Sequence, residues 1–250
     1  MQIAIPNQYH VDFGASAIPI IALMVLAPYW LGPITIKLKQ SRPASPQGMQ
    51  LVPDPALLPP VLAGFVAASR RALEALGFGN FAILRQGAGV VLLAEIEPGT
   101  VATALALQKK DGQLHSLVGF TSQLRHGGKI RTSNSPLPAI TPAPVGESRV
   151  RLPRERDTSR LYAIHRGRVA TATASGARMD RLAVADPVAY QNAEELSSLA
   201  QSVACGYWQR SGDRLTLTWK GAFLSAWRLL PPWRDISRSR DERSVAAARV

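Results

Sequence analysis

The stretch FGASAIPIIALMVLAPYWLGPITI, residues Phe13 to Ile36, decides how this chain is organised. It contains no Asp, Glu, Lys, Arg or His. A helix needs about 20 predominantly apolar residues to cross the hydrocarbon core of a bilayer. A single segment can satisfy its backbone groups there only as a helix. The stretch therefore predicts one transmembrane helix over residues 13–36.

A buried core helix is the alternative interpretation of the same stretch. Pro19, Pro28 and Pro33 favour it somewhat, because proline removes a backbone donor and kinks a helix. Spanning helices tolerate proline better than soluble helices do. Tyr29 and Trp30 lie near the end of the stretch, and amphipathic rings suit a headgroup layer. We take the membrane helix as the leading interpretation.

The charges around the stretch predict its orientation. Asp12 is the only Asp, Glu, Lys or Arg before it, whereas Lys37, Lys39 and Arg42 follow it. Positive residues close to a span tend to stay in the cytoplasm. We therefore expect a protein of the cell inner membrane, with its N-terminus outside and its C-terminal domain in the cytoplasm. A cleaved secretory signal is not favoured, because no basic residue precedes the stretch.

Composition limits the remaining possibilities. The 250 residues carry a formal net charge of +12, and 46% of them are hydrophobic. The length fits one domain behind the anchor, and the positive charge favours anionic partners, with phospholipid headgroups first and nucleic acid after them. A general preference for arginine would explain the charge equally well. The single cysteine, Cys205, excludes an internal disulfide and a cysteine zinc site, and no cofactor is predicted.

The sequence divides the chain into five parts. They are a short N-terminal segment (1–12), the transmembrane helix (13–36), a linker (37–53), a soluble domain (54–233) and a basic tail expected to be disordered (234–250).

Within the domain, short β-branched runs separated by tight turns predict an antiparallel meander of about five strands over residues 79–132. Asp54, Asp157 and Asp186 are placed to cap helices. We therefore predict an α+β fold in which helices cover the apolar face of the sheet. A hairpin is also expected at residues 207–218.

The aromatic C-terminal part holds the first group of candidate site residues. Trp227, Arg228, Trp233 and Arg234 combine large rings with positive charges, as a helix that docks on an anionic leaflet does. The alternative is that this aromatic face covers the hairpin or the sheet, because large aromatic side chains mostly become buried.

A basic segment holds the second group. Arg149, Arg151, Arg154 and Arg156 are the candidates for contacts with an anionic partner. A solvated face is the plainer interpretation, because no sequence signature of a nucleic-acid-binding fold accompanies them.

No catalytic or metal-ligating residue is predicted. The four histidines, His10, His115, His126 and His165, lack metal-ligand spacing, and no phosphate loop or nucleophile elbow is present. His165 is expected to be half buried in a helix. A triad assembled in space from Asp157, His165 and a serine is the minor alternative.

The order of these features resembles that of uncharacterised bacterial single-pass membrane-anchored proteins. The resemblance consists of an anchor, an Asp-Pro helix that ends in Leu76-Gly77-Phe78, a meander, and the segment LTWKGAF at residues 217–223. It covers most of the chain after the anchor and implies no activity.

The leading hypothesis is a membrane-tethered, non-enzymatic interaction or scaffold module whose basic surface faces the inner leaflet. Its expected partners are the membrane itself, anionic lipid headgroups and a partner protein. An enzyme or small-molecule sensor with a pocket between sheet and helices is the alternative, and nucleic-acid binding at the membrane is third.

Overall fold

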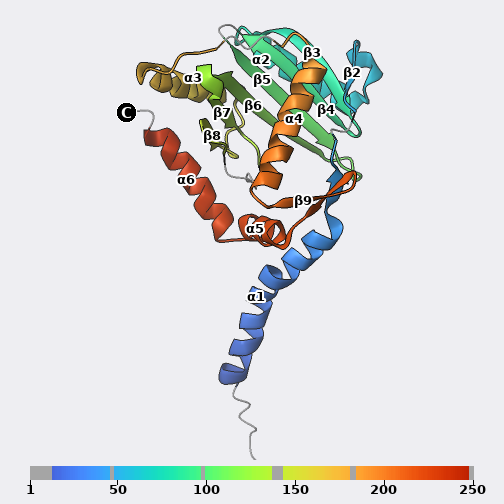
Figure 1. Cartoon of the computed structure of the whole chain (residues 1–250), viewed down its shortest axis with the longest axis vertical. Helices are drawn as coiled ribbons and strands as arrows, with labels where there is room; N and C mark the ends of the chain where they lie inside the picture. The colour runs from blue at the N-terminus through green and yellow to red at the C-terminus, as the bar shows by residue number, and fades with distance from the viewer. Residues whose placement is uncertain (1–12, 46–47, 97–98, 137–142, 181–183, 248–250) are drawn as a thin grey trace, which may run out of the picture.

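The chain folds into an α+β domain from which a long first helix projects (Figure 1). The computed structural model describes residues 13–45, 48–96, 99–136, 143–180 and 184–247, and of these it describes 13–23, 25, 126, 234 and 244–247 by their backbone alone. The domain is built on a seven-stranded sheet, with a second, three-stranded sheet beside it.

The larger sheet contains the predicted meander. Its strands, in spatial order, are β2 (Gln50–Leu51), β3 (Gly79–Gln86), β4 (Gly89–Ile96), β5 (Thr100–Gln108), β6 (Leu114–Gln123), β7 (Lys129–Ser133) and β8 (Glu147–Arg151). Neighbours from β2 to β7 are antiparallel, whereas β7 and β8 are parallel. The five strands β3 to β7 follow one another along the chain, and the short turns between them give this antiparallel order.

The linker predicted at residues 37–53 pairs with both sheets. Its first strand, β1 (Ser41–Pro43), pairs with β10 (Arg214–Leu217), which forms the expected hairpin with β9 (Trp208–Ser211). Its second strand, β2, pairs with β3. Both pairings satisfy the backbone of an edge strand that would otherwise be open, and they hold the linker against the domain.

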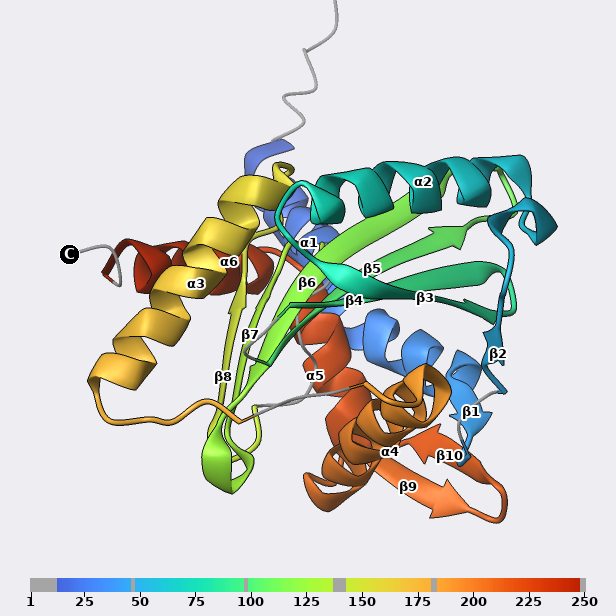
Figure 2. The same ribbon diagram turned by 90° about the horizontal axis from the view of Figure 1, so that it is seen from above.

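Two helices cover one face of the larger sheet, which we call the packed face (Figure 2). They are α2 (Pro60–Glu74), which follows the short helix η1 (Pro55–Leu57), and α3 (Thr158–Ala174). The core beneath them is apolar, with Leu62, Phe120 and Leu161 among its fully buried side chains.

The opposite face of the same sheet, which we call the cleft face, is covered by α4 (Pro187–Ala204) (Figure 2). Val91 and Leu93 of β4 point to this side and pack with Val188 of α4, whereas Val90 and Leu92 point to the packed face. Strand β4 is therefore buried on both faces, although the sequence predicted only one apolar face. A continuous apolar run such as residues 90–94 is typical of a strand covered on both sides.

The C-terminal part contains two helices, α5 (Trp219–Leu229) and α6 (Trp233–Ala247). A separate short helix, η2 (Arg125–Gly127), connects β6 to β7 in the larger sheet. Helix α6 occupies positions predicted to be a disordered tail, so that expectation is corrected. Arg, Glu and Ala are good helix formers, and α6 packs against α5 and β8. Asp241 of α6 pairs with Arg151 of β8 at 3.6 Å.

The predicted caps at Asp157 and Asp186 begin α3 and α4, whereas the cap at Asp54 begins the short η1 and not the longer α2, whose N-cap Pro59 makes no side-chain cap. The carboxylates of Asp54, Asp157 and Asp186 accept hydrogen bonds of 2.8, 2.8 and 2.9 Å from backbone N–H groups two residues later. Each aspartate thereby satisfies a donor that the first helical turn leaves free.

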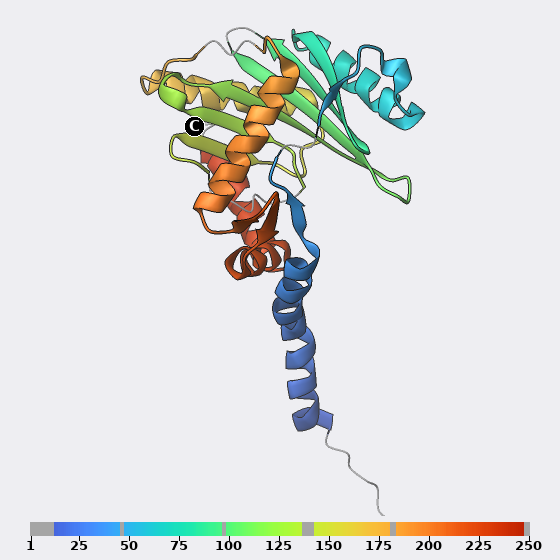
Figure 3. The ribbon, with the colours of Figure 1, turned by 45° about the vertical axis from the view of Figure 1, so that its right-hand side comes forward.

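Helix α1 (Phe13–Lys39) leaves the domain at its C-terminal end and extends away from it (Figures 1 and 3). No helix is long and apolar enough to cross a membrane within the residues that the structure describes with side chains. Most of the apolar block at 17–27 lies outside those residues, so the transmembrane helix stays a prediction.

Candidate functional site

Helix α5 turns its small residues toward the domain and its rings away from it. Its buried positions are Gly221, Ala222, Ser225 and Ala226. A Cβ added at Gly221 would overlap the carbonyl oxygen of Tyr207, so the helix lies directly against that backbone. Phe223 and Trp219 of α5 contact Trp30 and Lys37 of α1, whereas Trp227 also lines the cleft beside the larger sheet.

The outward rings meet the C-terminal half of α1 in a cluster that we call the aromatic collar. Its members are Tyr29, Trp30, Trp219, Phe223, Trp227 and Trp233. Tyr29 packs edge-on against Trp227 with ring centroids 5.6 Å apart, and Trp30 packs at 90° against Phe223 at 6.5 Å. Edge-to-face contacts of this kind are favourable for aromatic rings. They join the end of the predicted membrane helix to the domain.

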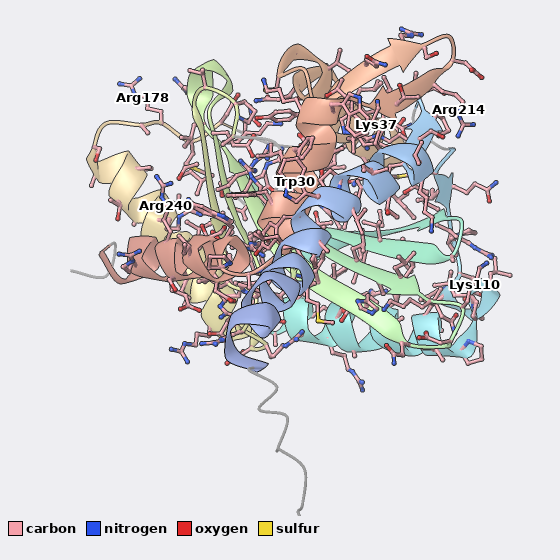
Figure 4. The ribbon with its side chains drawn as sticks, turned by 90° about the horizontal axis from the view of Figure 1, so that it is seen from below. Trp30, Lys37, Lys110, Arg178, Arg214 and Arg240 are labelled. Atoms are coloured by element: carbon pink, nitrogen blue, oxygen red, sulfur yellow. The ribbon has the colours of Figure 1, made fainter. Side chains whose placement is uncertain are left out.

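Lys37 of α1 also contacts the domain at this junction. Lys37 Nζ donates a 3.1 Å hydrogen bond to the carbonyl oxygen of Leu217 and lies 5.1 Å from the ring centroid of Trp219. Figure 4 looks onto the domain from the side of α1, with Trp30 against α5 and Lys37 further along α1. The last turns of α1 are thus held by rings and by a cation.

Of the four predicted docking residues, the two tryptophans belong to this junction and remain partly exposed. Trp227 and Trp233 stack with their centroids 5.3 Å apart, and 46% and 40% of their surfaces remain exposed. Arg228 follows Trp227 on α5. Arg234 belongs to α6, but its side chain lies outside the described residues.

A cleft of about 1150 Å³ lies between the cleft face of the sheet and helices α4, α5 and α6. It occupies the position where the alternative hypothesis expects a pocket. The strands contribute Arg131, Ser133, Glu147, Arg149 and Arg151. The helices contribute Tyr190, Glu194, Ser197, Ser198, Leu224, Trp227, Arg228, Trp233, Ile236, Arg240 and Asp241.

The four predicted anion-binding arginines do not form one surface. Arg149 and Arg151 line the cleft, whereas Arg154 and Arg156 lie beyond β8 and are exposed. Arg149 donates two hydrogen bonds to Glu147, the longer of which is 3.1 Å. Arg149 and Arg151 share the cleft face because they are two residues apart on one strand.

Two carboxylates link the basic side chains of the cleft wall. Glu194 of α4 accepts hydrogen bonds from Lys129 and Arg131 of β7. Burial favours the neutral form of Glu194, but Arg131 and Lys129 outweigh it and hold the pKa of this carboxyl below its usual value. Arg131 Nε also lies 2.8 Å from Glu147 Oε1. The network ties α4 to β7 and β8.

Burial also changes the titration of a phenol in the same cleft. Burial, together with the charge of Glu194, raises the pKa of Tyr190 to about 12. The phenol is therefore protonated at neutral pH and acts as a hydroxyl of the cleft wall.

Arg151 is the most deeply placed arginine of the cleft, with 9% of its surface exposed. Its Nη1 donates a 3.1 Å hydrogen bond to the carbonyl oxygen of Pro136. Its Nη2 is buried and has no hydrogen-bond partner in the described part of the chain. Burial lowers the pKa of Arg151, and Asp241 opposes this. The same burial raises the pKa of Asp241 against the pull of Arg151.

His165 lies on the packed face and is fully buried, not half buried as predicted. Its Nε2 lies 2.8 Å from Ser122 Oγ, which in turn lies 2.7 Å from Thr100 Oγ1. Its Nδ1 lies 3.0 Å from Thr132 Oγ1. Arg168 donates to the same Thr132 hydroxyl at 2.7 Å. Every polar atom of the imidazole is thus paired within the core.

This environment keeps the His165 ring neutral. Burial, together with the nearby charge of Arg168, lowers the pKa of His165 to about 3. Ser122 and His165 are both fully buried, so their contact gives a substrate no access. Asp157 caps α3 and does not contact the ring. The triad considered from the sequence is therefore not assembled.

The remaining candidates for chemistry are few in the described residues. His115 is exposed, as expected, and His126 lies outside the described side chains. No group of three His, Cys, Asp or Glu side chains capable of holding a metal ion occurs in the described part of the chain. Cys205 is a free thiol at the end of α4.

Comparison of the chain with protein families, with curated proteins and with solved structures finds no match. The fold class therefore rests on the geometry described above, and the resemblance noted in the sequence stays an expectation.

The sequence analysis expected a pocket between sheet and helices only as an alternative and did not predict which residues line it. Arg131 and Ser133 on β7, with Glu147, Arg149 and Arg151 on β8, alternate along their strands. Alternation of this kind indicates one common face, which was a usable signal. That α4, α5 and α6 stand opposite this face depends on contacts between segments that are distant in the sequence.

Proposed function

We propose that the protein is a membrane-tethered, non-enzymatic interaction module whose domain rests on the inner leaflet around the exit of α1. In this proposal residues 13–36 span the membrane, the N-terminus lies outside, and the domain lies in the cytoplasm. The aromatic collar is the observation that carries the proposal.

The collar combines large rings with considerable exposure. Trp30 has 66% of its surface exposed, Trp219 51% and Trp227 46%, although each contacts another ring or a cation. Contiguous exposed apolar surface on a soluble domain marks an interaction site. Tryptophan is enriched where a protein meets the membrane interface. The rings gather at the end of α1 that joins the domain, where a headgroup layer would lie.

Basic side chains surround the collar. Lys37 and Lys39 end α1, Arg214 lies on the β9–β10 hairpin, and Arg240 lies on α6 (Figure 4). Each Lys or Arg near an anionic leaflet contributes about 1 kcal/mol of attraction. Their position after the apolar stretch agrees with a cytoplasmic domain.

Alkaline carbonate extraction of membranes from cells that make the full chain tests the tether. We expect the protein to stay in the membrane pellet and to dissolve only with detergent. Alkaline carbonate disrupts ionic contacts with the membrane surface but does not extract an inserted helix. Recovery of the protein in the carbonate supernatant would contradict the proposed transmembrane helix. Protease added to spheroplasts tests the orientation, since a cytoplasmic domain stays intact until the membrane is opened.

Lipid quenching of tryptophan fluorescence tests docking separately. We expect lipids brominated near the headgroup to quench the reconstituted full chain, and Trp227→Phe to remove part of the quenching. Trp208→Phe is the matched control, because Trp208 lies on β9 outside the collar, 4.4 Å from the guanidinium of Arg42. Equal loss in both variants, or no quenching at all, would contradict docking while leaving the tether intact.

A further inference from the structure

The cleft described above has the dimensions and the chemistry of a ligand site. Its volume of about 1150 Å³ exceeds that of a single ion, and sites for small molecules usually measure about 300–1,000 Å³. It is lined by hydroxyl, guanidinium and aromatic groups from strands and helices alike. Ligand binding in the cleft does not depend on the membrane tether.

The polar wall carries an unsatisfied cation. Arg151 is about nine-tenths buried, with 9% of its surface exposed, and its Nη2 has no hydrogen-bond partner in the described structure. Asp241 lies 3.6 Å from Nε, which is longer than a hydrogen bond. Leaving a buried donor unpaired is unfavourable, and more so for a charged group. A turn of the guanidinium that brought Nη2 to an acceptor atom of a ligand in the cleft would remove that cost.

The charge of the lining selects an anion. Five arginines face three carboxylates, namely Glu147, Glu194 and Asp241. Glu194 is shared between Lys129 and Arg131, and Glu147 is close to both Arg131 and Arg149. The carboxylates are therefore already engaged by more positive charges than they can neutralise, and the wall keeps a positive potential.

The type of anion follows from the donors. Guanidinium groups recognise phosphate and carboxylate through paired N–H donors. Ser133, Ser197 and Ser198 add hydroxyl groups to the wall. A phosphate monoester has three terminal oxygens and can engage several such donors together, whereas a carboxylate has two oxygens. The number of donors therefore favours phosphate.

The wall formed by α5 and α6 carries apolar side chains beside Arg228, Arg240 and Asp241. Leu224 and Trp227 of α5 and Trp233 and Ile236 of α6 line the cleft there, and the two rings stack. A ligand that fills the cleft therefore has a second part that is apolar or ring-shaped.

We propose that the cleft binds a phosphate ester, with the phosphate on Arg151 and the rest of the molecule on Trp227 and Trp233. Lipid headgroups and soluble organic phosphates share this chemistry. The two classes differ in the group esterified to the phosphate, which is a lipid in one and a soluble organic molecule in the other. The binding experiment distinguishes them.

Calorimetric titration of the purified full chain in a nonionic detergent tests the proposal. One arm uses dihexanoyl phosphatidate and the other uses glucose 6-phosphate, each against the same compound without phosphate. We expect saturable one-site binding of at least one ester. Binding of phosphatidate alone identifies a lipid headgroup, binding of the sugar phosphate alone identifies a soluble ester, and binding of both shows that the phosphate dominates. Saturation by neither ester overturns the proposal.

Variants separate the cleft from general attraction to a basic protein. Arg151→Gln should weaken binding about tenfold or more, the effect of one charge-assisted hydrogen bond. Arg154→Gln is the matched control, because Arg154 is exposed and does not line the cleft, and its affinity should stay unchanged. Equal weakening by both variants overturns the proposal. If Arg151→Gln does not fold, Arg149→Gln decides in its place, and an unchanged affinity there counts against the site.

Discussion

The two faces of the seven-stranded sheet come from the same strands but differ in chemistry. On the packed face the side chains remain mostly apolar from Leu92 of β4 through Phe120 of β6 to Val150 of β8. On the cleft face they change from Leu93 of β4, through polar side chains, to the arginines and glutamate of β7 and β8.

This gradient shows how one sheet can serve stability and binding together. The packed face and the β3–β5 half of the cleft face bury apolar side chains and stabilise the fold. The β6–β8 half of the cleft face holds charges in a cleft, where they stabilise little but can recognise a ligand. Four experiments test whether the division holds, beginning with the largest expected effect.

Truncation of an aromatic side chain should cost more stability on the packed face than in the collar. Phe120 is 1% exposed and lies 5.6 Å from Phe78 and 5.0 Å from Tyr162, between ring centroids. Phe120→Ala should lower the free energy of unfolding by about 3–5 kcal/mol, because it leaves a cavity in a closed core. Phe223→Ala, at a half-exposed ring of the collar, should cost under about 1.5 kcal/mol. Urea unfolding followed by circular dichroism measures both, and equal losses would contradict the division.

Acid should destabilise the packed face through His165. Its pKa is about 3 in the folded chain and 6.5 for an unperturbed histidine, so between these pH values the unfolded chain binds a proton that the folded chain does not. The stabilisation is complete above about pH 6.5 and is lost, by about 1.4 kcal/mol per pH unit, as the pH falls toward 3. Between about pH 6 and pH 4 the loss is roughly 2–3 kcal/mol.

His165→Gln isolates this contribution. Unfolding of both proteins at several pH values gives two slopes, and the variant should have the shallower slope between about pH 6 and pH 4. The slope decides, not the stability at neutral pH, because the variant also loses hydrogen bonds to Ser122 and Thr132. Parallel slopes would show that folding does not lower the pKa of His165.

Two helical glycines test how closely the covering helices approach their neighbours. Gly221→Ala in α5 should destabilise by about 1–3 kcal/mol, because the new Cβ overlaps the Tyr207 carbonyl and the helix must move. Gly167→Ala in α3 has no atom within 4 Å of the new Cβ and should stabilise by about 0.5–1 kcal/mol. Thermal unfolding compares them, and effects of the same sign would contradict the close contact of α5.

The smallest expected effect comes from the charges of the cleft. Glu194→Gln removes a carboxylate that holds Lys129 and Arg131 and should cost about 1–2 kcal/mol, since these groups are largely buried. Glu74→Gln is the same substitution in the half-exposed pair with Arg70 on α2 and should cost under about 0.5 kcal/mol. A loss at Glu194 no larger than at Glu74 would show that the network contributes no stability. Urea unfolding measures both.

The sequence predicted the elements whose signals are local. Caps at Asp54, Asp157 and Asp186 and the strands β3 to β7 follow from capping residues, tight turns and alternation, all of which act within about ten residues. The α+β class follows from these elements. The candidate site was predicted only in its components: Arg149, Arg151, Trp227, Arg228 and Trp233 were named in two separate groups, and the structure places all five around one cleft.

The remaining features depend on the tertiary structure. No local pattern connects the segments that meet in three strand pairs, namely β1 with β10, β2 with β3, and β7 with β8. The same holds for the contacts of α6 with α5 and β8. The sequence by itself determined which side chains share a face of a strand or helix, because backbone geometry sets that spacing. Only the tertiary structure decided which faces meet and which charges become buried, because burial and solvation are properties of the neighbours that the folded chain brings together.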